Sequence, residues 1–178
     1  MKEENTVRKI VLGAMFLSIG IVLPFFTGQI PQIGRMLLPM HIPVFLCGLI
    51  CGWKYGAVVG LVLPFLRSFI FGMPPLYPNA VWMAAELAAY GLVIGLLYRF
   101  IRVRGRVYIA LISAQLAGRV VWGVVKAILL GASGKTFAFS AFLTGGFVDA
   151  FPGILLQIIL IPPILLLLEK RLKFGEKA

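Results

Sequence analysis

Long apolar segments separated by short polar breaks dominate the chain. A helix of about 18 apolar residues reaches across a hydrocarbon core of ~30 Å, because each residue adds ~1.5 Å. The alternation of polar and apolar residues that is typical of a membrane β-barrel is absent from the sequence. The pattern therefore predicts an all-α integral membrane protein, a bundle of six transmembrane helices. We expect the helices at residues 8–26, 41–53, 55–71, 80–101, 107–131 and 140–169.

The breaks between these segments are rich in glycine and proline, and none of them looks like a linker between domains. We therefore expect residues 1–178 to form a single six-helix membrane domain. Pro162 and Pro163 interrupt the last segment, where a bend is expected. GxxxG spacings, such as Gly91 and Gly95, predict close packing between neighbouring helices.

Lysine and arginine are unevenly distributed between the two ends of the predicted helices. The sequence holds 17 of them against 6 acidic residues, and 61% of it is hydrophobic. The termini and the breaks after the second and fourth helices carry most of these cations, whereas the opposite side carries only Arg35 and Lys135. Because cytoplasmic loops are enriched in Lys and Arg, both termini should be cytoplasmic in a cell membrane. This distribution by membrane side also argues against a nucleic-acid partner.

A small set of polar and aromatic residues lies inside the predicted membrane segments, where a charge costs at least ~2.5 kcal/mol. Residues four and seven apart share one face of a helix, so each of the fourth and fifth segments has one polar face. The set comprises Arg67 on the third segment, Asn79, Trp82, Glu86 and Tyr90 on the fourth, Gln115, Arg119, Trp122 and Lys126 on the fifth, and Asp149 and Gln157 on the sixth.

Two interpretations of this set stay open. In the first, the charges neutralise one another, Glu86 with Lys126 or Arg67, and Asp149 with Arg119. In the second, the last three helices line a cavity that opens outward, in which some of these groups face a ligand. Three cations against two carboxylates then favour an anionic substrate. Arg67 could instead reach the outer interface.

Other chemistry finds little support. Cys47 and Cys51 have only His41 to complete a metal set, so we expect no metal and no cofactor. His41 itself is either a polar group at a helix start or a ligand contact. Glu86 and Asp149 could form an acid/base pair, but HExxH, GxSxG and GxxxxGK[ST] are missing from the sequence. An enzyme is thus disfavoured, and a stand-alone secondary transporter or channel is the alternative to a binding subunit.

The segments MLLPMHIPV, CGLICGWKYGAVVGLVLPFLRS and GMPPLYPN resemble the S components of energy-coupling factor (ECF) transporters, the prokaryotic vitamin importers of the ABC class. The resemblance covers nearly the whole chain. It implies a pocket for a small nutrient between the fourth, fifth and sixth helices. The substrate-binding candidates are then Asn79, Trp82, Glu86, Tyr90, Gln115, Arg119, Trp122, Lys126, Asp149 and His41.

The resemblance also implies moving parts and partners. Residues Gln29 to His41 and Gly72 to Asn79 would act as lids over the pocket. The first helix would dock on a membrane-embedded T subunit, where Ala14 and Ser18 approximate the family's Ala-x-x-x-Ala pattern. Two cytoplasmic ATPase subunits would hydrolyse ATP, so that this chain would not itself be an enzyme.

Overall fold

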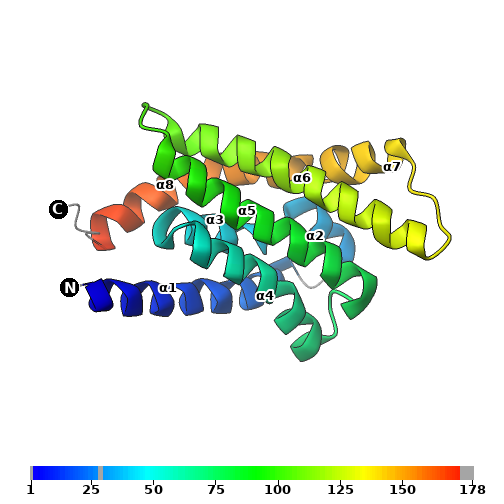
Figure 1. Cartoon of the computed structure of the whole chain (residues 1–178), viewed down its shortest axis with the longest axis horizontal. Helices are drawn as coiled ribbons and strands as arrows, with labels where there is room; N and C mark the ends of the chain where they lie inside the picture. The colour runs from blue at the N-terminus through cyan, green and yellow to red at the C-terminus, as the bar shows by residue number, and fades with distance from the viewer. Residues whose placement is uncertain (1, 28–29, 173–178) are drawn as a thin grey trace.

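The chain folds into a bundle of helices, most of which run along one long axis (Figure 1). The computed structural model describes residues 2–27 and 30–172, and these contain helices and turns but no strand. The helices are α1 (Lys2–Val22), α2 (Pro31–Leu37), α3 (His41–Cys51), α4 (Trp53–Phe71), α5 (Val81–Phe100), α6 (Arg106–Ala132), α7 (Phe139–Leu143) and α8 (Phe151–Leu172). Three single turns, η1 (Leu23–Thr27), η2 (Leu76–Ala80) and η3 (Thr144–Val148), join or extend them.

Five helical stretches are long and apolar enough to cross a membrane, which confirms the predicted all-α membrane class. The second predicted helix corresponds to α3, which has 11 residues and would reach only about 16 Å. Nearly all of its residues are buried, because α3 lies between α1, α4, α5 and α8 and is apolar on every side. The five spanning stretches are Thr6–Phe26, Trp53–Phe71, Leu76–Phe100, Arg106–Ala132 and Phe139–Lys170.

The structure divides the helix expected at residues 140–169. It contains α7, the π-turn η3 and a turn before α8 begins at Phe151. Two neighbouring glycines, Gly145 and Gly146, weaken the helix at η3, and the N–H of Asp149 donates to the carbonyl of Thr144, five residues earlier, at 2.8 Å. Pro162 and Pro163 lie within α8 without ending it.

The loop expected after the first helix is also more ordered than the sequence indicated. It contains the short helix α2, which packs against α8. A Cβ on Gly153 of α8 would lie only 2.5 Å from the Met36 carbonyl oxygen, so a glycine is needed for this approach. Gln29, where the expected lid begins, is outside the described residues.

Glycines let the backbones of α4 and α5 touch, as the GxxxG spacings predicted. A Cβ on Gly91 would overlap the backbone of Gly56, and one on Gly60 would overlap the Leu87 carbonyl. Gly52 is needed for its backbone conformation and not for a close approach between helices. It forms the turn between α3 and α4 with φ 97°, a conformation that suits glycine.

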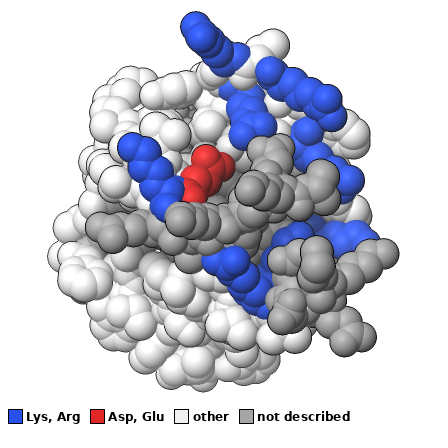
Figure 2. Space-filling model, turned by 90° about the vertical axis from the view of Figure 1, so that its left-hand side faces the viewer, with Lys and Arg blue, Asp and Glu red and all other residues white. Residues whose placement is uncertain are grey.

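The described ends of α1 and α8 lie at the same end of the bundle, together with the connection between α5 and α6 (Figure 1). Figure 2 shows this end, and basic side chains are spread across it. A network ties three helices together there: Arg106 Nη2 donates to Tyr98 Oη at 2.9 Å, and Tyr98 Oη donates to Glu169 Oε1 at 2.8 Å.

Candidate functional site

The centre of the candidate site is an ion pair between α5 and α6. Arg119 Nη1 lies 2.8 Å from Glu86 Oε1, and the two side chains are only 5% and 3% exposed. The sequence suggested Lys126 or Arg67 as the partner of Glu86 and Asp149 as the partner of Arg119, and the structure corrects both pairings. Buried pairs seldom stabilise a bundle more than apolar side chains do, so this one points to a function.

Tyr90 and His41 hold the carboxylate side of the pair. Tyr90 Oη donates to Glu86 Oε1 at 2.7 Å, one helical turn away. The tyrosine ring packs against His41 and Phe45, with ring centroids 5.0 and 4.8 Å away. His41, which begins α3, is buried next to this network. Glu86 is therefore held by Tyr90 of its own helix and by Arg119 of α6, and α3 packs against the tyrosine ring.

Gln115 lies one turn from Arg119 on α6, but its amide is engaged elsewhere. Its Nε2 donates to Gln157 Oε1 on α8 at 2.9 Å, and both residues are buried. Gln157 Nε2 reaches the Leu38 carbonyl at 3.5 Å, next to α2. The two amides thus link α6, α8 and the loop that was expected to act as a lid.

Lys126 lies about two turns, roughly 10 Å, from Arg119 along α6. Its Nζ is 5.2 Å from the ring of Trp82, 4.5 Å from Trp122 and 5.1 Å from Phe137, distances at which a cation and an aromatic face attract. Trp122 is buried and also packs against Phe142 of α7. Aromatic side chains from α5, α6 and the following loop therefore surround the cation.

Two of the sequence-predicted residues are not brought into this cluster by any described contact. Asn79 is half-buried in η2. Asp149 is exposed, in the turn between η3 and α8, and the ion pair of Arg119 is made with Glu86 instead. The two carboxylates of the suggested acid/base pair differ in environment, because Glu86 is buried and Asp149 is exposed.

Arg67, which one interpretation directed to the outer interface, bonds the backbone at the end of α1. It is buried, and its Nη1 donates to the Ile21 carbonyl near the end of α1 at 2.6 Å. Pro24 has no N–H and so cannot bond this carbonyl in the tight turn η1. Phe25 and Phe71 flank the guanidinium, with ring centroids 5.5 and 5.6 Å away. Arg67 therefore ties α4 to α1 and lies apart from the Glu86 pair.

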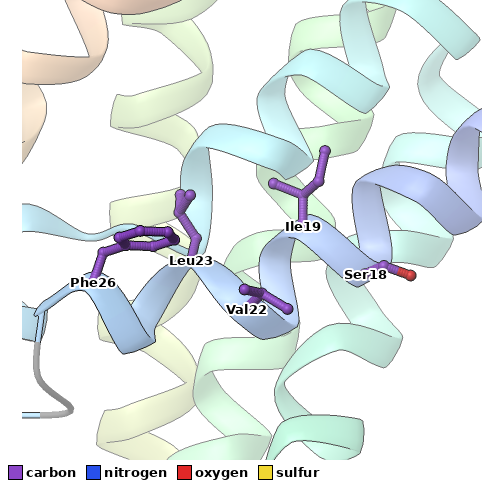
Figure 3. A pocket seen from close by; sticks show the side chains of 5 residues that line it. All are labelled: Ser18, Ile19, Val22, Leu23 and Phe26. Carbon is purple, nitrogen blue, oxygen red and sulfur yellow. The ribbon is translucent and has the colours of Figure 1, made fainter.

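The outer face of α1 carries Ala14 and Ser18, both exposed. The Ser18 hydroxyl donates to the Ala14 carbonyl at 3.0 Å, so this small-residue face offers no free hydroxyl donor. Ser18 also lines an open apolar cavity of about 320 Å³ with Ile19, Val22, Leu23 and Phe26 (Figure 3). A second cavity, of about 410 Å³, lies at the basic end of the bundle, near Lys9, Lys54 and Arg99.

Four contributors to the site were missed in the sequence. Phe45, Phe137 and Phe142 were hidden among many apolar residues. Gly118 had a detectable signal, since it lies between Gln115 and Trp122 on the polar face of α6, where a glycine indicates close approach. A Cβ there would overlap the Tyr90 ring. Among the described residues no group of three His, Cys, Asp or Glu side chains could hold a metal, and both cysteines are buried free thiols.

These features define a class: a multi-pass membrane protein that encloses a charged and aromatic site between its helices. The description "ECF transporter, substrate-specific component" is that of a family whose sequence pattern matches residues 8–165. The chain belongs to this family, whose members bind small-molecule substrates and work with T and ATPase subunits. No curated protein and no solved structure matched the chain.

Proposed function

We propose that this chain is the S component of an ECF-type ABC importer in a prokaryotic cell membrane, and that it captures a water-soluble vitamin or related nutrient from outside. The observation that carries the proposal is the buried Glu86–Arg119 pair, with Lys126 further along α6. It lies between α5 and α6, two of the helices that the resemblance implicates in binding. Trp122 and Tyr90 supply the flat surfaces against which a small organic molecule packs.

The charges of the cluster favour an anionic nutrient. Arg119 pairs with Glu86, and Lys126 acts electrostatically on the same carboxylate, so that two cations influence one acidic side chain. Asp149, the other carboxylate of the predicted set, is exposed in the turn before α8. The two cations would attract a negatively charged group of the substrate in a low-dielectric site.

The orientation that fits this function has six membrane segments and both termini in the cytoplasm. The ends of α1 and α8 lie together at the basic end, which suits the positive-inside rule (Figures 1 and 2). Lys126 lies toward the opposite end of α6, which would face outward. The short helix α3 would complete the six segments as an interior helix.

The partners that fit are a membrane-embedded T subunit and two cytoplasmic ATPases. The T subunit would dock on α1 at Ala14 and Ser18, where small side chains and the adjoining apolar cavity allow close approach of another helix (Figure 3). ATP hydrolysis would be the work of the ATPase subunits, and this chain would bind its nutrient without catalysis.

The test is whether the purified chain holds a small molecule by itself. The protein is isolated without partners or ATP, denatured, and its released compounds are identified by mass spectrometry. We expect about one compound per chain, and a loss of at least about tenfold in Glu86→Ala relative to Leu92→Ala, an exposed control on the same helix. A chain that carries no compound, or a compound retained equally by both variants, would contradict the proposal.

A further inference from the structure

Arg119 has hydrogen-bonding capacity that the protein does not use. Its guanidinium carries five N–H donors, and Nη1 is engaged by Glu86. Nε and Nη2 are buried and have no hydrogen-bond acceptor among the described residues. Buried donors without a partner are costly, and those of a charged group are the most costly of all. The residue is 4% exposed, so bulk water does not reach it freely.

The two unused atoms form one edge of the guanidinium plane. Nε and Nη2 point their N–H groups in parallel, a spacing that matches the two oxygens of a carboxylate. Glu86 does not compete for this edge, because its Oε1 holds Nη1 and also accepts from Tyr90. The ion pair thus fixes the guanidinium and leaves its side-on fork for another acceptor.

The surroundings of the fork suit an organic molecule with one acidic group. The glycine pair of η3 packs beside the Trp122 indole: a Cβ on Gly145 would be 3.3 Å from it and one on Gly146 3.6 Å. A Cβ on Gly146 would also come within 3.9 Å of Arg119 Cδ. The indole therefore adjoins the arginine, and η3 presents no side chain from these two positions.

We propose that the Nε–Nη2 edge of Arg119 binds the carboxylate of the substrate side-on, so that the nutrient captured by this chain is a carboxylic acid. The inference rests on the proposed function and names its substrate class. A carboxylate is planar, so that its two oxygens can lie in the plane of the guanidinium fork, and it carries one negative charge. A phosphate monoester is tetrahedral and carries nearly two negative charges, which are costlier to bury.

The experiment compares the compound released from the wild type with that from Arg119→Lys, which keeps the charge but removes the fork. Val120→Ala, an exposed neighbour, is the control. Each released compound is treated with carbodiimide and methylamine, and a carboxylate is recognised in the mass spectrum by its conversion to the methylamide. We expect a carboxylic acid from the wild type and the control, and a loss of at least about tenfold from Arg119→Lys.

Two results would overturn the inference alone: a compound without a carboxylate, or a carboxylic acid that Arg119→Lys retains at the wild-type level. The absence of any compound from all three proteins would overturn the proposed function together with the inference. If Arg119→Lys does not fold, as judged by gel filtration, the compound released from the wild type still tests the inference, because a compound without a carboxylate would overturn it.

Discussion

At the residue scale, the central feature is a charge pair in a place where charges are costly. The sequence identified both members, because Glu86 and Arg119 stand out in apolar helices. It could not identify their pairing, since three cations and two carboxylates lie inside the predicted membrane segments. Asp149 was the other candidate partner of Arg119. The last predicted helix breaks at η3, and this break leaves Asp149 in an exposed turn.

The pairing predicts a double-mutant result. Glu86→Gln and Arg119→Met should each lower the free energy of unfolding by about 3 kcal/mol or more, because each leaves one buried charge without its partner. The double variant should cost clearly less than the sum, with a coupling energy of about 0.5–3 kcal/mol. Denaturant titration in mixed micelles measures all four proteins, and additive costs would contradict a direct interaction.

At the element scale, the site depends on how closely α5 and α6 approach. Tyr90 reaches Glu86 while its ring lies against Gly118 of α6, where there is no side chain. The sequence predicted α5 and α6 to within a residue or so, because long apolar runs with clear glycine and proline breaks fix helix bounds. It missed α2, a short helix that packs against α8, and it missed the division of the last helix, where the Gly145–Gly146 pair lies in a long apolar run.

The close approach can be tested with one added methyl group. Gly118→Ala should push the Tyr90 ring away from α6 and destabilise the protein by about 1–3 kcal/mol, as overpacking does. It should also reduce the amount of compound that co-purifies. Gly131→Ala on the same helix is the matched control, because a Cβ there meets nothing within 4 Å. Equal melting temperatures and equal ligand content for the two variants would show that the approach at Gly118 is unimportant.

At the scale of the whole molecule, the basic end and the charged site lie at different levels of one bundle. The cations Lys54, Arg99 and Lys170 lie exposed at one end, whereas Lys126 is seven residues further than Arg119 toward the other end of α6. This separation suits a protein that is oriented by its cytoplasmic charges and takes up its cargo from the opposite side. The sequence already separated the cations of the termini and breaks from those inside the helices, and the fold brings the ends of α1 and α8 and the α5–α6 connection to one end of the bundle (Figure 1).

The most direct test of the account is an experimental structure of the chain loaded with the compound that co-purifies with it. We predict density between α6 and η3, beside Trp122, with an acidic group about 2.7–2.9 Å from Nε and Nη2 of Arg119. A compound bound instead in the apolar cavity beside Ser18, or in the basic cavity near Lys9 and Arg99, would contradict the claim that the Glu86–Arg119 pair forms the substrate site.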